Sequence, residues 1–375
     1  MSKNGTEAKR KPRWVIKLGS SLLTEDGLGL AKNAIADWAA QMQQLRNQGI
    51  DVVIVSSGSV AEGCGRLGWQ QRPRDLYKLQ AAAAVGQMGL VQAWESQFQS
   101  DGAHTALVLL IEDDVRNRQR YLNARKTLNA LLAYNVVPVV NENDTVANEE
   151  LRFGDNDSLA ALVANIIYAD RLVIMTDQLG LFDADPRTDP RACLIEEGKS
   201  SDDSLLEKAG EGSGALGRGG MRTKVLAARQ AAISGTDTYI VSGRADNVLL
   251  RLLAGEAIGT HLAADRKPAL ARKQWIAGNA NTRGKLWLDQ GAVKVISESG
   301  RSLLPVGVTR CEGQFSVGDV VSCLSPDGKE IARGLVAMPA EEVAQVLGKT
   351  REQISDANVR PRDAELIHRD NLVLL

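Results

Sequence analysis

Short apolar runs alternate with longer stretches of helical periodicity through residues 14–241. The predicted strands are Trp14–Leu18, Asp51–Val55, Thr105–Leu110, Val136–Val140, Arg171–Thr176 and Asp237–Val241. The predicted helices lie near Ala31–Gln48, Leu76–Ser100, Tyr121–Tyr134, Ser158–Ile167 and Arg222–Ser234. Strands this apolar are buried on both faces, and their alternation with helices predicts an α/β fold with a mainly parallel sheet between two helix layers.

The pattern changes after about residue 270, where short alternating segments are separated by glycines. These segments predict strands at Gly284–Leu288, Ala292–Ile296, Gly307–Cys311, Asp319–Leu324 and Ile331–Val336. A Ser-Pro-Asp-Gly turn at 325–328 lies between two of them, and a helical piece follows near Glu341–Leu347. We therefore expect a first domain over residues 14–270, a small, mostly β domain over 276–355, and tails at 1–13 and 356–375.

Composition is that of an ordinary globular protein, with 44% hydrophobic and 24% charged residues. The formal net charge of −1 argues against a general binder of polyanions. Residues 272–375 hold 14 Lys and Arg against 13 Asp and Glu, so the second domain has no basic excess either. RNA is therefore not an expected partner, because RNA binders need a basic footprint.

The four cysteines are scattered without CxxC spacing, and the three histidines lie far from every motif. A zinc site and a histidine-based catalytic triad are therefore not expected, and the cysteine usage fits a reducing cytosol. The basic N-terminal tail leads into Trp14-Val15-Ile16, which Lys17 interrupts, so it does not have the pattern of a signal peptide. No apolar run has the length of a membrane span, and we expect a cytoplasmic protein.

The glycine-rich run at 214–224 contains no acid and ends in Lys224, where a helical pattern begins. Glycines let backbone N–H groups close around a phosphate, and a helix N-terminus adds a positive dipole end. Lys224 could then reach a transferring phosphoryl group as a point charge. The alternative is a flexible surface loop.

Lys17 lies inside the first predicted strand, where a lysine is unusual unless something pairs with it. It would lie beside a phosphate bound at the end of the strand, or it would be an edge-strand lysine that reaches water. Ser57 and Gly58 follow the second strand in the same way: the glycine permits close backbone approach, and the serine can bind a small polar substrate. An ordinary strand–helix turn would look similar.

A dense group of acids and amides covers residues 141–145 and 153–157, in a long loop between a strand and a helix. Such side chains suit an amino-acid substrate with an ammonium group. Asp157 could instead cap the helix or orient the two lysines. Thr176 and Asp177 follow the fifth strand, where a nucleotide base or ribose could be held.

Two G-x-G-x-x-G matches, at 63–68 and 212–217, do not open a helix directly from a strand, so the dinucleotide-binding fingerprint is not met. The Walker motif G-x-x-x-x-G-K-[ST] is missing as well, which argues against a Walker-type NTPase.

Several motifs together resemble the glutamate 5-kinase family of the amino acid kinase superfamily. They are Lys-Leu-Gly-Ser-Ser at 17–21, Ser-Ser-Gly at 56–58, Asn-Glu-Asn-Asp at 141–144, Phe-Gly-Asp-Asn-Asp at 153–157, Thr-Asp-Gln-x-Gly-Leu-Phe-x-Ala-Asp-Pro-Arg at 176–187 and Gly-Gly-Met-x-Thr-Lys at 219–224. The resemblance extends from residue 14 to about 355 and includes a C-terminal part that is similar to a PUA domain. Ser20 and Arg218 stand where the family usually has threonines.

This resemblance implies the three-layer αβα amino acid kinase fold and ATP-dependent phosphorylation of the γ-carboxylate of L-glutamate, with Mg²⁺, as the first step of proline synthesis. Lys17, Lys224 and Asp157 would be the catalytic residues. The residues implied for L-glutamate are Ser57, Gly58, Asp144 and Asn156. Those implied for ATP are Lys17, Thr176, Asp177, Arg218, Gly219, Gly220, Met221, Arg222, Thr223 and Lys224. No side chain is assigned to a metal. The family also implies inhibition by proline and a homo-oligomer, either dimer or tetramer.

Two alternatives stay open at this point. A sister kinase of the same fold could act on aspartate, acetylglutamate, carbamate or UMP, since specificity depends on the cluster at 141–157. The PUA-like domain could instead belong to an RNA-binding or RNA-modifying protein, although the even charge balance disfavours this.

Overall fold

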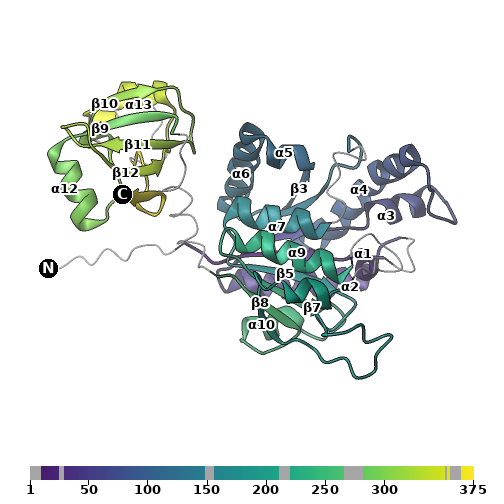
Figure 1. Ribbon diagram of the computed structural model, residues 1–375. Coiled ribbons are helices and arrows are strands. Elements are labelled where there is room, and N and C mark those ends of the chain that lie inside the picture. Colours follow the sequence, from purple (N-terminus) through teal and green to yellow (C-terminus); the bar gives the residue numbers. More distant parts are fainter. Residues whose placement is uncertain are drawn as a thin grey trace. The chain divides into compact units, whose positions relative to one another are not determined.

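The computed structural model describes residues 10–24, 29–147, 156–210, 220–265, 282–350, 353–354 and 365–375 (Figure 1). The chain forms two compact units, Met1–Pro268 and Ala269–Leu375. Each unit has its own sheet and its own hydrophobic core.

Within the described residues, the first unit contains an eight-stranded sheet with the order β3-β4-β2-β1-β5-β7-β8-β6. Its strands are β1 (Arg13–Leu18), β2 (Asp51–Val55), β3 (Thr105–Leu110), β4 (Val137–Glu142), β5 (Arg171–Thr176), β6 (Glu197–Lys199), β7 (Asp237–Ser242) and β8 (Thr260–Ala263). Neighbouring strands run parallel except β7 and β8, which are antiparallel. The predicted mainly parallel sheet is confirmed, and the short strands β6 and β8 add to the six that the sequence predicts.

Helices cover both faces of this sheet (Figure 1). They are α1 (Ser20–Leu23), α2 (Lys32–Asn47), α3 (Ser59–Arg66), α4 (Leu76–Gln99), α5 (Glu112–Arg116), α6 (Arg118–Ala133), α7 (Asn156–Ile167), α8 (Ser204–Lys208), α9 (Met221–Ala232) and α10 (Val248–Leu253). All five predicted helices are present, and the shorter α1, α3, α5, α8 and α10 are not predicted by the sequence pattern.

Alternate side chains of β1 enter two different cores. Ile16 and Leu18 pack with α1, α2, α4 and α10, whereas Val15 packs with α6, α7 and α9. Because successive side chains of a strand point to opposite faces, Lys17 lies on the same face as Val15, toward α7 and α9. This placement decides what the lysine can contact.

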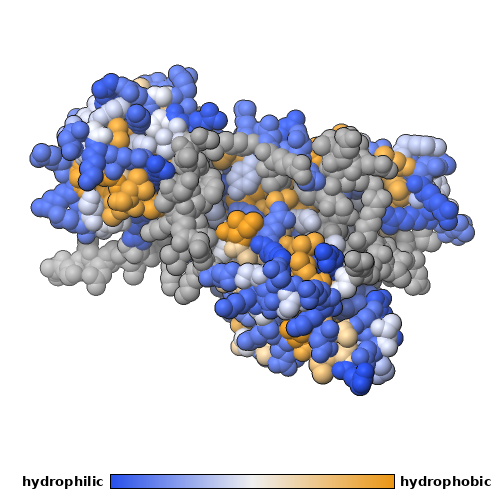
Figure 2. Space-filling model, viewed as in Figure 1, coloured by the Kyte–Doolittle hydropathy of each residue, from blue (hydrophilic) through white to orange (hydrophobic). Residues whose placement is uncertain are grey.

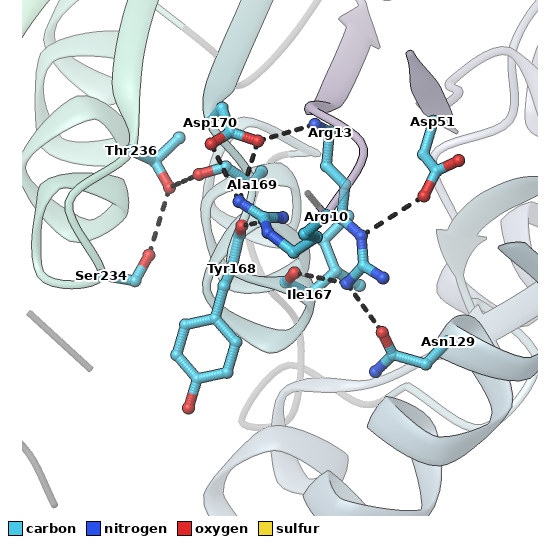
Figure 3. Close-up of polar contacts among 10 residues, drawn as sticks. All are labelled: Arg10, Arg13, Asp51, Asn129, Ile167, Tyr168, Ala169, Asp170, Ser234 and Thr236. Carbon is cyan, nitrogen blue, oxygen red and sulfur yellow. Dashed lines mark hydrogen bonds and ion pairs between the residues drawn. The ribbon is translucent and has the colours of Figure 1, made fainter. Parts of the chain in front are cut away.

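The amino end of β1 is fixed by a network of polar contacts (Figure 3). The Arg13 backbone N–H donates to the Asp170 carboxylate at 2.7 Å, and the Arg13 guanidinium donates to the Ile167 carbonyl at 2.8 Å. The Arg10 guanidinium binds both oxygens of Asp170, at 2.9 and 3.0 Å. The Arg13 side chain also donates to Asn129 at 2.7 Å. The strand that carries Lys17 is thereby held in register at its opposite end.

The second unit contains a five-stranded sheet of order β10-β9-β11-β12-β13 among its described residues. Its elements are β9 (Gly284–Leu288), α12 (Gln290–Ser299), the 3₁₀ turn η1 (Pro305–Gly307), β10 (Val308–Gly313), β11 (Val320–Leu324), β12 (Glu330–Leu335), α13 (Ala340–Val346), the 3₁₀ turn η2 (Arg369–Asn371) and β13 (Leu372–Leu374). The predicted turn at 325–328 is confirmed: the Gly328 N–H donates to the Ser325 carbonyl at 2.9 Å, with Gly328 at a φ of +83°.

The prediction of a strand at Ala292–Ile296 is wrong, because these residues lie in α12. The Asp289 side chain accepts a hydrogen bond from the Ala292 N–H at 2.6 Å and so caps the helix start, and Gly300 ends the helix in the left-handed region. Ala292, Val293 and Ile296 all pack into the core of the second unit. Their spacing also fits one face of a helix, and the cap decides between the two patterns.

In the described parts of the chain, helix length and apolarity fall short of what a membrane crossing requires. Over the face that Figure 2 shows, hydrophilic residues predominate and hydrophobic residues occur in small separate patches.

Candidate active site

Asp157 is a fully buried carboxylate that binds two lysines. It lies in the first turn of α7 with 0% of its side chain exposed. The Lys17 ammonium lies 2.5 Å from Asp157 Oδ1, and the Lys224 ammonium lies 3.0 Å from Asp157 Oδ2. The sequence allows Asp157 either to cap a helix or to orient the lysines, and in the structure it binds both lysines.

The three residues meet because one strand ends and two helices begin at the same place. Lys17 is at the carboxyl end of β1, Asp157 is at the start of α7, and Lys224 is in the first turns of α9. In open α/β sheets, ligands bind beyond the carboxyl ends of the strands. The group therefore lies where such a fold places its site.

The two ammonium groups determine the charge state of Asp157. Burial alone would raise the pKa of this carboxyl group, but the nearby charges of Lys17 and Lys224, and their hydrogen bonds, hold the pKa well below its usual range. Two positive charges and one negative charge leave a net charge of +1 in a buried setting. Such a site favours an anion, because the charges are poorly screened by water.

The start of α9 adds further polar groups beside this carboxylate. The Thr223 hydroxyl lies 2.9 Å from Asp157 Oδ2 and 2.8 Å from the Gly220 carbonyl oxygen. Gly220 is the N-cap of α9 and offers no side chain to the first N–H groups of the helix. These N–H groups and the helix dipole make an anion-binding end close to the two lysines.

Gly19 lies next to the Lys17 ammonium group and leaves room beside it only for a small residue. A Cβ at Gly19 would lie 3.9 Å from the Lys17 ammonium nitrogen, so any longer side chain would extend into the surroundings of that ammonium group. The positive charge and the helix N-terminus together fit a phosphate group.

Thr176 ends β5, the strand next to β1, and Asp177 follows it. The Gly19 N–H donates to the Met175 carbonyl at 3.2 Å, so the end of β5 lies against the turn after Lys17. Thr176 is buried and donates from its hydroxyl to Asp177 at 3.2 Å, while Asp177 is exposed. Both residues are at the same edge of the sheet as the lysines.

A second cluster, made of hydroxyls and amides, surrounds Asn156. The Asn156 side-chain NH₂ lies 2.8 Å from Ser57 Oγ, 3.0 Å from the Ser56 carbonyl oxygen and 3.1 Å from Asn141 Oδ1. Asn156 directly precedes Asp157 at the start of α7, so this cluster adjoins the charged group. The two predicted sets of site residues are therefore neighbours.

Gly58 and Asp144 complete this cluster. Gly58 is the N-cap of α3 and has a φ of +98°, a left-handed conformation that favours glycine. The Asp144 carboxylate lies 3.5 Å from the hydroxyl of Ser59, the first residue of α3. The predicted Ser57, Gly58, Asp144 and Asn156 thus come together at the carboxyl ends of β2 and β4.

Four of the residues predicted to bind ATP have no contact with the lysine group among the described contacts. Arg218 and Gly219 lie outside the described residues. The Arg222 guanidinium donates to the Leu206 carbonyl at 3.3 Å, and Met221 packs against a small cluster that includes Leu205.

Two further residues, Asn141 and Gln87, belong to this cluster and are not among the predicted site residues. Asn141 lies near the carboxyl end of β4 and is 2% exposed, and a buried polar residue at a strand end could have drawn attention. Gln87 lies inside the long helix α4 and carries no local signal of a site.

Among the described residues, no group of three or more His, Cys, Asp or Glu side chains is arranged to hold a metal ion.

Comparison with known proteins gives two family matches. The amino acid kinase family matches residues 12–242, and the PUA domain matches residues 284–356.

Curated relatives match over the whole chain. Glutamate 5-kinase from Nitrosococcus oceani is 57% identical over 375 residues, and glutamate 5-kinase from Thioalkalivibrio sulfidiphilus is 56% identical over 375 residues; in both cases the match covers 100% of each chain. Among solved structures, UMP kinase from Bacillus anthracis aligns with a TM-score of 0.49 at 15% identity, covering 69% of this chain and 98% of that one.

Proposed function

The chain belongs to the amino acid kinase family, and we propose from this that it transfers the γ-phosphoryl group of ATP to the γ-carboxylate of L-glutamate. The product would be L-glutamyl 5-phosphate, the first intermediate of proline synthesis. The relatives that match the whole chain carry the name glutamate 5-kinase. The observation that carries the proposal is the pair of lysines on Asp157, next to the hydroxyl and amide cluster around Asn156. We call this cluster the acceptor pocket.

The reaction requires two anions to approach each other. An oxygen of the substrate carboxylate forms a bond to the γ-phosphorus as the bond to the β–γ bridging oxygen breaks, and ADP leaves with that electron pair. A carboxylate is already ionised at neutral pH, so the step needs no general base. Rate enhancement then depends on positioning and on neutralising charge.

Lys17 and Lys224 would supply this neutralisation at the transferring phosphoryl group. Asp157 holds both ammonium groups in place and, with its low pKa, stays ionised throughout the physiological range. Because the lysines are already oriented, little reorganisation is needed as charge develops in the transition state.

Ser57, Gly58, Asp144 and Asn156 would hold L-glutamate. The Asp144 carboxylate is suited to the substrate ammonium group, and hydroxyl, amide and backbone N–H groups are suited to its carboxylates. Asn156 and Asp157 are consecutive, which keeps the acceptor and the phosphoryl-transfer group at a fixed separation.

Thr176, Asp177 and residues 218–224 would bind ATP, with its phosphates at the N-terminus of α9. Mg²⁺, when bound, neutralises part of the charge on the phosphates. It would be held mainly by phosphate oxygens, which are the hard ligands that Mg²⁺ prefers.

Family membership also supports several finer proposals. We propose that L-proline inhibits the enzyme, that the chain forms a dimer or tetramer, and that it works in the cytoplasm. The kinase domain would extend over residues 14–270, and the PUA-like domain over 276–355.

The test is a turnover assay of the purified protein with ATP, Mg²⁺ and L-glutamate in the presence of hydroxylamine, which converts an acyl phosphate into a hydroxamate. Release of ADP is measured in parallel for aspartate, acetylglutamate, carbamate and UMP. Hydroxamate formation that depends on glutamate supports the proposal. If another compound of the panel gives faster ADP release than glutamate, that compound is the substrate and the proposal is wrong.

A further inference from the structure

Helices α3 and α4 pack against each other unusually closely. A Cβ at Gly63 of α3 would lie 1.7 Å from the Ala82 carbonyl oxygen, and a Cβ at Gly86 of α4 would lie 1.8 Å from the Ser59 carbonyl oxygen. Only glycine is compatible with backbones at this separation. The close crossing fixes α4 beside α3, which begins immediately after Gly58 of the acceptor pocket.

The residue after Gly86 is Gln87, which is buried with 8% exposure. Its neighbours on the same side of α4, Ala83, Leu90 and Trp94, are buried and mostly apolar. A buried amide is costly unless it is hydrogen-bonded. Gln87 has such a partner, because its Oε1 accepts a hydrogen bond from the Asn141 side-chain NH₂ at 3.4 Å.

Asn141 connects Gln87 to the proposed acceptor pocket. Asn141 Oδ1 accepts hydrogen bonds from the Asn156 side chain at 3.1 Å and from the Glu142 backbone N–H at 2.9 Å. If the Asn141 amide were rotated by half a turn, its NH₂ would face the NH₂ of Asn156, and its oxygen would face the oxygen of Gln87. Gln87 and the Glu142 N–H therefore both favour the orientation of Asn141 that holds Asn156, and Gln87 is the side chain that accepts from the Asn141 NH₂.

From this geometry we infer that Gln87 is a positioning residue for the acceptor substrate. It acts through Asn141 on Asn156 and so fixes the polar lining of the pocket that takes the amino-acid substrate. This inference rests on the proposed function for the identity of that substrate. Gln87 is separate from the lysines that serve phosphoryl transfer, so its removal should weaken substrate binding more than it slows the chemical step.

The test compares Gln87→Met, which has similar volume but no acceptor, with Gln92→Met at an exposed position of the same helix. For Gln87→Met we expect the KM for L-glutamate to rise about tenfold, as for loss of a buried hydrogen bond, with the KM for ATP and kcat changed by less than about threefold. Gln92→Met should match the unsubstituted enzyme. Asn156→Ala and the double variant Gln87→Met/Asn156→Ala should have the same KM, because Gln87 acts through Asn156.

Two outcomes would overturn the inference. One is an unchanged KM for glutamate in Gln87→Met. The other is a double variant in which the KM effects of Gln87→Met and Asn156→Ala add independently. A crystal structure of Gln87→Met separates this inference from the proposed function. If the unsubstituted protein does not phosphorylate glutamate, the proposed function is wrong. The crystal structure still decides the inference: a reoriented Asn141 amide that has lost Asn156 supports it, and an unmoved amide contradicts it.

Discussion

Lys224 binds the carboxylate of Asp157 at 3.0 Å, although 67 positions of sequence separate the two residues. The carboxylate is fully buried and also binds Lys17 from the neighbouring strand β1. A single lysine would leave the buried pair neutral, whereas two lysines leave one positive charge. This excess charge distinguishes the group from a purely structural ion pair and makes it suited to an anionic ligand.

Replacing Lys224 by alanine should abolish most of the turnover while the fold is retained. Lys17 would still pair with Asp157, but one of the two charges proposed to stabilise the transferring phosphoryl group would be lost. We expect kcat to fall by at least about 100-fold, measured as hydroxamate formation. Lys208→Ala, at an exposed position, is the matched control. Near-normal acyl-phosphate formation by the Lys224→Ala enzyme would contradict the proposed role.

Replacing Asp157 by asparagine should destabilise the protein in a way that depends on pH. The folded-state pKa of Asp157 lies below its unfolded value of about 3.9, so the carboxylate stabilises the fold above about pH 4. This contribution is lost as the pH falls through the folded-state pKa. Leaving two buried ammonium groups without their partner should cost about 3 kcal/mol near neutral pH.

The measurement for Asp157→Asn is the midpoint of urea unfolding across a range of pH. The difference from the unsubstituted protein should be the same at pH 6 and pH 8 and should shrink below about pH 4. Asp246→Asn changes an exposed carboxylate and should have no such effect. A difference that already disappears between pH 8 and pH 6 would show that another group is responsible.

Replacing Ser57 by alanine should affect the acceptor substrate and leave the nucleotide largely unaffected. The Ser57 hydroxyl is a partner of the Asn156 amide and lies apart from the two lysines in the hydrogen-bond network. We expect the KM for L-glutamate to rise about tenfold and the KM for ATP to change little. Ser96→Ala, on the outer side of α4, serves as the control. An equal rise in both KM values would argue against a separate acceptor pocket.

Much of the kinase fold could be predicted from the sequence because its strands are buried on both faces. Runs such as Trp14–Leu18 and Arg171–Thr176 have no polar face, and this pattern occurs almost only in parallel sheets covered by helices. The convergence of Lys17 and Asp157 could also be predicted in part. Polar residues that follow neighbouring parallel strands meet at one edge of the sheet.

Other features depend on tertiary contacts that leave little trace in the sequence. The strand β6 has the short, largely exposed sequence Glu197-Gly198-Lys199, and its pairing in the sheet is with β8. In the second unit, the alternation at 292–296 fits a strand as well as a helix, and the Asp289 cap decides in favour of the helix. Gln87 could not be found either, because its link to Asn141 requires the close crossing of two helices.

Replacing Gly86 by alanine tests whether this crossing matters for both stability and substrate binding. The added Cβ would lie 1.8 Å from the Ser59 carbonyl oxygen, so α4 must move away from α3. We expect a loss of about 2 kcal/mol in the free energy of unfolding, because overpacking against backbone cannot be relieved by a side-chain rotation. The displacement of α4 would also draw Gln87 away from Asn141, so we expect the KM for glutamate to rise as well.

Ala84→Ser, on the exposed side of α4, provides the control for Gly86→Ala. Full stability of Gly86→Ala in a thermal melt would show that the helices can separate freely, and the acceptor pocket would then not depend on their packing.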